Sequence, residues 1–178
     1  MIGEKIEELA YYFSVAAHQA VQQKRKYTNE PYYRHPYEVA QIVKSVGGTP
    51  SMVAAAYLHD CVEDTGVDQW TIDQMFGAHI GDLVAGLTDV SKPEQGNRAA
   101  RKQIDREHTA LQSPECKTIK LADLISNSRS IVKHDKDFAR VYIKEKELLL
   151  EVLTEGDATL YAQAKQIVEE AKKELGVE

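Results

Sequence analysis

The chain has 178 residues, of which 43% are hydrophobic, so it is long enough to bury a core and we expect a single domain over residues 1–178. Its formal charge of −6 opposes a broad nucleic-acid interface, which needs a basic face for the phosphates. Two cysteines are too few for a disulfide framework, and no apolar run reaches the roughly 18 residues of a membrane span. These features favour a cytoplasmic protein with no nucleic-acid or membrane partner, and they leave its oligomeric state open.

The first half of the chain alternates helical patterns with turn signals. Apolar side chains recur at helical spacing over residues 3–23, and a polar segment then predicts a loop. Pro36 suits the first turn of a second helix, and Thr49 followed by Pro50 predicts the start of a third. This third helix, residues 51–66, is apolar on most sides until its last turns, so we expect it at the centre of the fold.

The second half of the chain continues the helical pattern. Thr71 and Gln74 form a capping-box pattern for a fourth helical region, which we expect in two pieces around Gly77. Further helices are expected over residues 98–112, from Ser113-Pro114 onward, over 136–154 and over 158–174, after a loop at 91–97. Asp157 is the expected cap of the last of these helices. No alternating run of β-branched residues bounded by turns is present, so the pattern predicts an all-α fold.

The end of the third helix concentrates residues that could hold a cation. His59, Asp60, Glu63 and Asp64 lie within six residues, and a spacing of four brings His59 near Glu63 and Asp60 near Asp64. Carboxylates at a helix C-terminus repel one another and oppose the helix dipole, by about 0.3–1 kcal/mol each when exposed. A bound cation would remove this conflict. The alternative is a solvated acidic helix end.

Two residues elsewhere in the chain could complete such a site. His35 stands at the start of the second helix, and Asp123 lies in an otherwise apolar helix, where a carboxylate is costly unless it is paired or binds a metal. With His59 and Asp60 they make a set of two imidazoles and two carboxylates. Such a set suits Mn²⁺, Fe²⁺, Co²⁺ or Zn²⁺ better than Ca²⁺ or Mg²⁺.

Four strings occur along the chain in a fixed order: RK (25–26), EPYYRHP (30–36), AAYLHDCVEDTG (55–66) and IKLADLISNSR (119–129). Together they resemble the HD-domain hydrolases of the RelA/SpoT type, and most closely the stand-alone small alarmone hydrolases. The resemblance extends from about residue 5 to about residue 155. It implies an HD-domain helical bundle around a single metal site.

The resemblance also implies a role for individual residues. The implied Mn²⁺ ligands are His35, His59, Asp60 and Asp123. The implied catalytic pair, which positions and activates water, is Glu63 and Asp64. The implied substrate-binding residues are Arg25, Lys26, Asn127 and Tyr142, the last placed only by its spacing from the downstream EVL.

The activity implied by the resemblance is Mn²⁺-dependent hydrolysis of the 3′-pyrophosphate of ppGpp-like alarmones, the nucleotides of the stringent response. The products would be a nucleoside 5′-diphosphate or 5′-triphosphate and pyrophosphate. One alternative is an HD phosphohydrolase for another nucleotide, such as an adenine alarmone or a deoxynucleotide. Another is a catalytically silent, nucleotide-binding regulatory HD module, against which the presence of both Glu63 and Asp64 argues.

Overall fold

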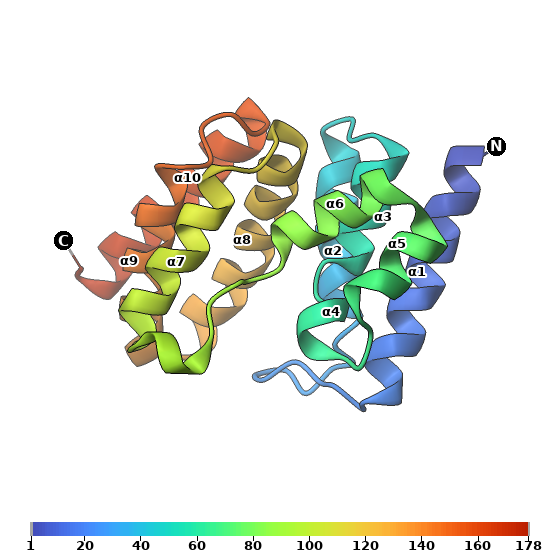
Figure 1. The fold of residues 1–178 in the computed structure, drawn as a ribbon. Coiled ribbons are helices and arrows are strands. Elements are labelled where there is room, and N and C mark those ends of the chain that lie inside the picture. Colours follow the sequence, from blue (N-terminus) through green and yellow to red (C-terminus); the bar gives the residue numbers. More distant parts are fainter. Residues whose placement is uncertain (1, 178) are drawn as a thin grey trace. The chain divides into compact units, whose positions relative to one another are not determined.

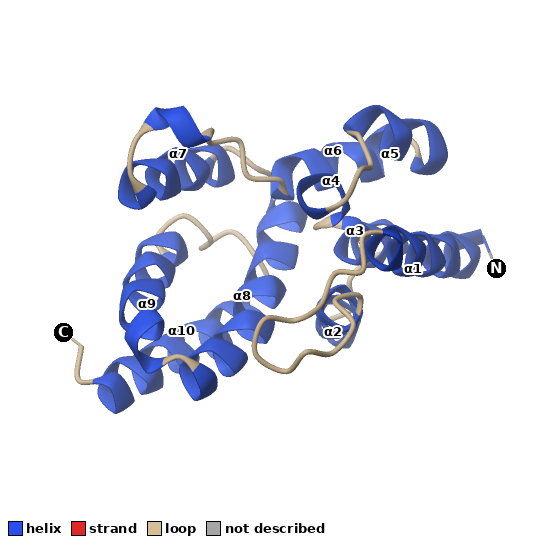
Figure 2. Cartoon of the chain, turned by 90° about the horizontal axis from the view of Figure 1, so that it is seen from below, coloured by secondary structure: helices blue, strands red, loops and turns tan. Residues whose placement is uncertain are grey.

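The computed structural model describes residues 2–177, and within this range the regular elements are helices (Figures 1 and 2). An isolated antiparallel bridge between Lys24 and Pro31 is the strand-like pairing that the described residues contain. The predicted all-α fold is therefore confirmed. None of the described helices combines the length and the apolar character that crossing a bilayer would require.

The chain forms two compact units, Met1–Thr88 and Asp89–Glu178, and each is described by itself. The helices of the first unit are α1 (Ile2–Ala20), α2 (Arg34–Ser45), α3 (Pro50–Leu58), α4 (Cys61–Asp64), α5 (Gln69–Phe76) and α6 (Ala78–Leu87). Helix α3 packs against α1, α2 and α6, and its side chains from Met52 to Leu58 are all buried. Three consecutive alanines, Ala54 to Ala56, let the neighbouring helices approach closely. The expectation that this segment lies at the centre is confirmed for the first unit.

The predicted third helix is not continuous. Helix α3 ends at Leu58, and Asp60, with φ −97° and ψ −3°, precedes a separate helical turn, α4. The backbone N–H of Asp64 still donates to the Asp60 carbonyl at 3.0 Å, so the spacing of four within that turn is kept. Apolar periodicity does not reveal this break, since Asp60 is polar and its neighbours on both sides keep helical spacing.

The start of α5 also differs from the prediction. Its N-cap is Asp68, whose carboxylate accepts from the Thr71 N–H at 2.8 Å and from the Thr71 hydroxyl at 2.6 Å. The expected box of Thr71 with Gln74 is therefore wrong, since an aspartate three residues before Thr71 caps the same N–H group. The division at Gly77 is confirmed, and its φ of +84° is a conformation that favours glycine.

The second unit is built around one long helix. Its elements are η1 (Pro93–Gln95), α7 (Arg98–Ala110), α8 (Pro114–His134), α9 (Lys136–Leu150) and α10 (Ala158–Leu175). Helix α8 packs against α9 and α10 through a buried face that includes Ile119, Leu121 and Ile125. The side chain of Ser113 caps α8 and that of Asp157 caps α10, as the sequence predicts.

Both cysteines of the described chain belong to buried surfaces, which makes their reactivity a test of the fold. Cys61 is 0% exposed and Cys116 is 2% exposed. Burial raises the pKa of the Cys61 thiol to about 12 and that of Cys116 to about 11. The nucleophilic thiolate is therefore scarce in both.

We expect neither cysteine of the folded protein to react appreciably with an aromatic disulfide reagent at about pH 8, because both are protonated and inaccessible. Both should react at once after unfolding in guanidinium chloride, which serves as the control for total thiol. Rapid modification of either thiol in the folded protein would contradict the packing around α3 or α8.

Candidate metal centre

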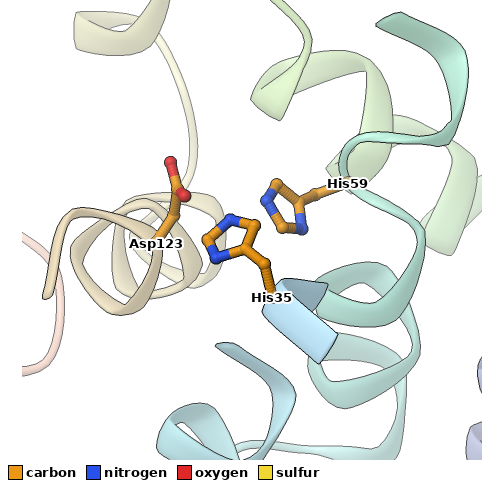
Figure 3. Close-up of side chains that lie close together, drawn as sticks. All are labelled: His35, His59 and Asp123. Atoms are coloured by element: carbon orange, nitrogen blue, oxygen red, sulfur yellow. The ribbon is translucent and has the colours of Figure 1, made fainter. Parts of the chain in front are cut away.

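Two imidazoles and one carboxylate converge in the first unit. His35 lies in the first turn of α2, while His59 and Asp60 lie directly after α3. The two imidazole rings are 5.3 Å apart between centroids, and each offers a ring nitrogen within 4.8 Å of the other (Figure 3). Asp60 Oδ2 lies 3.6 Å from His35 Nε2 and 3.2 Å from His59 Nε2. The histidine side chains are buried, and 15% of the Asp60 side chain is exposed.

The hydrogen bond of His59 fixes which ring nitrogen can bind a metal. His59 Nδ1 lies 2.7 Å from the Ala56 carbonyl oxygen, which can only accept, so Nδ1 carries the proton. In the neutral ring, Nε2 then has a lone pair, and it is Nε2 that faces the Asp60 carboxylate. A lone pair and an anionic oxygen at this distance repel unless a second proton or a cation lies with them. The donor set therefore fits a divalent cation.

A tyrosine that the sequence argument left without a role holds the carboxylate. The Tyr32 hydroxyl donates to Asp60 Oδ2 at 2.7 Å. The Tyr32 ring also contacts His35 edge-on, with 5.8 Å between centroids. Tyr32 is the tyrosine of the Tyr-x-x-His-Pro string, so the motif contained this residue although it did not reveal its partner.

The expected catalytic pair lies on the one-turn helix α4. Asp64 Oδ2 accepts a hydrogen bond from Gln23 Nε2 at 2.9 Å. Partial desolvation raises the pKa of the Asp64 carboxyl, and the negative charge of Asp60 raises it further. A higher pKa makes a carboxylate a better proton acceptor. Glu63 is exposed on the same turn.

Two of the expected substrate-binding residues, Arg25 and Lys26, lie in the loop between α1 and α2. The Arg25 N–H donates to the Glu30 carbonyl at 2.8 Å, and the Asn29 N–H donates to the Arg25 carbonyl at 3.0 Å, which closes a tight turn. The Arg25 guanidinium lies 5.9 Å from the centroid of the Tyr32 ring, and Lys26 Nζ lies 4.9 Å from that of Tyr27. The loop thus brings Arg25 to the same tyrosine that contacts His35 and Asp60.

Asp123 lies in the second unit, on α8 (Figure 3), and Asn127 lies on the same helix. Asn127 Nδ2 donates to Asp123 Oδ1 at 2.7 Å, so the two residues share one helical face. Lys120 Nζ lies 3.9 Å from Asp123 Oδ2, and 15% of the Asp123 side chain is exposed. Asp123 is therefore a hydrogen-bonded carboxylate on a largely buried helix. Its place in the ligand set stays a prediction.

Tyr142 is a buried residue of α9. It is 5% exposed, and its hydroxyl accepts from Ser128 Oγ on α8 at 3.4 Å. Lys146 Nζ lies 4.7 Å from the centroid of the Tyr142 ring. Burial, together with the positive charge of Lys120, lowers the pKa of Lys146 to about 8. The sequence does not single out Lys146, because a single lysine in a charged helix carries no distinguishing signal.

Comparisons with known proteins agree with this architecture. The family model described as HD domain matches residues 10–149, and the chain belongs to that family. GTP pyrophosphokinase rsh of Brucella melitensis biotype 1 is 34% identical over 140 residues, which cover 76% of this chain and 18% of the relative. A probable guanosine-3′,5′-bis(diphosphate) 3′-pyrophosphohydrolase of Synechocystis sp. is 42% identical over 83 residues, covering 47% of this chain and 10% of the relative. The chain thus spans less than a fifth of either relative.

Two solved structures share the fold. A metazoan orthologue of SpoT, described as hydrolysing ppGpp, superposes with a TM-score of 0.82 at 24% identity, over 97% of both chains. The protein lmo0812 of Listeria monocytogenes EGD-e superposes with a TM-score of 0.65 at 25% identity, over 81% of this chain and 99% of that one. The expected HD-domain fold is confirmed.

Metal should stabilise the folded protein, because a cation removes the repulsion between His59 Nε2 and the Asp60 carboxylate. A ligand that binds only the native state adds about 2.7 kcal/mol when its concentration is a hundred times Kd. We therefore expect EDTA to lower the melting temperature and Mn²⁺ to restore it. Asp60→Asn protein is the control and should melt at the same temperature in EDTA and Mn²⁺. An unchanged wild-type melting curve, with metal removal verified by elemental analysis, would contradict the site.

Proposed function

We propose that the protein is a Mn²⁺-dependent hydrolase that removes the 3′-pyrophosphate from ppGpp-like alarmones, a guanosine-3′,5′-bis(diphosphate) 3′-pyrophosphohydrolase. The observation that carries the proposal is the convergence of His35, His59 and Asp60, with Asp64 one turn further on. The names of the Synechocystis relative and of the metazoan SpoT orthologue support the choice of substrate.

The proposed metal ligands are His35, His59, Asp60 and Asp123. Mixed nitrogen and oxygen donors support Mn²⁺, and the resemblance of the sequence to alarmone hydrolases favours it over the other metals that such a set can hold. The bound ion would supply Lewis-acid polarisation of the phosphorus under attack. Proton transfer and substrate binding are assigned to side chains of the protein.

Asp64 is the proposed acceptor of the proton from the attacking water, with Glu63 helping to orient that water. The raised pKa of Asp64 supports this role, since a more basic carboxylate takes a proton more readily. Attack of the water oxygen forms a new P–O bond, and the bond between phosphorus and the ribose 3′ oxygen breaks. The 3′ oxygen leaves as a hydroxyl after taking up one proton, which balances the proton that Asp64 accepted from water and later releases. Pyrophosphate is the second product.

The substrate is a small nucleotide, for which Arg25, Lys26, Asn127 and Tyr142 are the proposed contacts. Arg25 and Lys26 are cations in a chain of net charge −6, and phosphate oxygens need such partners. The position of the Arg25 guanidinium near the Tyr32 ring supports a flat surface on which a purine could stack. Stacking of this kind accepts guanine and adenine alike.

A single panel of assays tests the proposal. Purified protein with added Mn²⁺ is offered guanine alarmones, adenine alarmones, deoxynucleotides and ordinary nucleotides, and the release of pyrophosphate is followed. We expect release from alarmones that carry a 3′-pyrophosphate. Turnover of deoxynucleotides alone would assign another phosphohydrolase activity. Tight binding of alarmones without any turnover would assign a regulatory module.

Mutation of a metal ligand and mutation of the proton acceptor should have different effects on bound metal and on turnover. Asp60→Ala should lose bound metal, because it removes a donor. Asp64→Ala should keep its metal and lose turnover by ~10²–10⁴-fold, the usual contribution of a positioned acid or base. Elemental analysis of the two purified variants, beside their rates, decides the matter. Loss of metal from Asp64→Ala as complete as that from Asp60→Ala would make the division wrong.

Arg25 and Lys26 should affect binding more than chemistry. Arg25→Lys keeps the charge and loses the flat stacking surface, so we expect a higher KM with a nearly unchanged kcat. Lys26→Ala should raise KM and reduce its dependence on salt, because one phosphate partner is gone. Steady-state kinetics at two salt concentrations measures both effects. A fall in kcat at constant KM in both variants would place these residues at the reacting centre instead.

A further inference from the structure

A hydrogen-bonded chain runs from a buried histidine to Asp64. His18, near the end of α1, is 1% exposed, and its Nδ1 lies 2.7 Å from Gln23 Oε1. Gln23 Nε2 donates in turn to Asp64 Oδ2 at 2.9 Å. On the other side of the ring, His18 Nε2 lies 3.9 Å from the sulfur of Cys61. All of these residues belong to the first unit.

The donor and acceptor properties of these groups allow only one direction for the hydrogen bonds between His18 and Asp64. An ionised carboxylate only accepts, so Gln23 must turn its amide nitrogen toward Asp64 and its amide oxygen toward His18. His18 Nδ1 must then carry the proton and donate it. His18 Nε2 is left as the acceptor, and it faces the sulfur of Cys61. Burial lowers the pKa of His18, in keeping with a neutral ring.

Hydrogen bonds hold the backbone of Gln23, so its remaining freedom lies in the side-chain amide. The Gln23 N–H donates to the His18 carbonyl at 3.1 Å, and the Tyr32 N–H donates to the Gln23 carbonyl at 3.0 Å. The main chain of Gln23 is therefore held on both sides. Its side-chain amide can still rotate, and a rotated amide would point its oxygen at the Asp64 carboxylate. The hydrogen bond from His18 adds to the attraction of the Asp64 carboxylate in favouring the observed orientation.

We propose that His18 and Gln23 are positioning residues for Asp64. The protonated Nδ1 of His18 and the Asp64 carboxylate together fix the orientation of the Gln23 amide, and Gln23 holds Asp64 Oδ2, so that Oδ1 receives the proton of the attacking water. Neither residue touches substrate or metal in this scheme. The proposal rests on the role given to Asp64 in the proposed function.

The same histidine also packs against Tyr32, with 5.0 Å between the ring centroids, so a role in packing alone has to be separated from a role in positioning. Two substitutions do this. His18→Asn keeps a donor close to the place of Nδ1 and loses the ring. His18→Phe keeps a ring against Tyr32 and loses the donor.

Positioning predicts that His18→Asn retains a kcat close to that of the wild type, while His18→Phe and Gln23→Ala lose roughly 10- to 100-fold, as misplaced catalytic groups do. KM and bound Mn²⁺ should change little in all three variants. Adding His18→Phe to Gln23→Ala should cost little more, because the two residues act in series. The reverse order, with His18→Phe active and His18→Asn impaired, would overturn the proposal in favour of packing.

A measurement without turnover separates this proposal from the proposed function. The ¹⁵N chemical shifts of His18 report which ring nitrogen carries the proton. We expect the Nδ1–H form in the wild type and a mixture with Nε2–H in Gln23→Ala. An Nε2–H ring in the wild type would refute the chain, whatever the substrate proves to be. If the Nδ1–H form is found and no alarmone is hydrolysed, the proposed function fails and the hydrogen-bonded chain stands.

Discussion

Closely spaced hydrogen-bond acceptors in the first unit repel one another, and the rest of that unit has to hold them together against this repulsion. His59 Nε2 faces the Asp60 carboxylate at 3.2 Å, and Asp64 adds a second negative charge one turn away. Such an arrangement persists only where the surrounding structure holds it in place. Here the fully buried α3 does so, because the residues before His59 are packed between three other helices. A cation would convert this imposed repulsion into attraction, which is the physical reason to expect a metal.

The loop between α1 and α2 joins the separate parts of the site. Gln23 donates to Asp64, the proposed proton acceptor, and Tyr32 donates to Asp60, a proposed metal ligand. The same short segment carries Arg25, a proposed substrate contact, which lies near Tyr32. The bridge between Lys24 and Pro31 closes this loop, and the Arg25 turn stiffens it. A change in the shape of the loop would therefore alter metal binding, proton transfer and substrate binding together.

The sequence predicts those features of the structure that one residue or one short motif determines. The caps at Thr49, Ser113 and Asp157 and the division at Gly77 follow from single residues, and the Tyr-x-x-His-Pro and His-Asp strings led to the residues that converge in the first unit. The break after α3 leaves no mark in the apolar periodicity, and the contact of Asp60 with Tyr32 joins residues that lie 28 positions apart in the sequence. The chain from Gln23 to Asp64 spans 41 residues and leaves no periodic trace in the sequence. The single-domain expectation and the inclusion of Asp123 among the ligands stay predictions.

The most direct test of the central claim is to identify the atoms bound to Mn²⁺. Pulsed electron paramagnetic resonance of the Mn²⁺-loaded protein detects coupling of the metal to imidazole nitrogen. The account predicts nitrogen couplings from two histidine rings in the wild type, one of which disappears in His35→Ala and the other in His59→Ala. A spectrum with oxygen ligands alone, unchanged by both substitutions, would contradict the account.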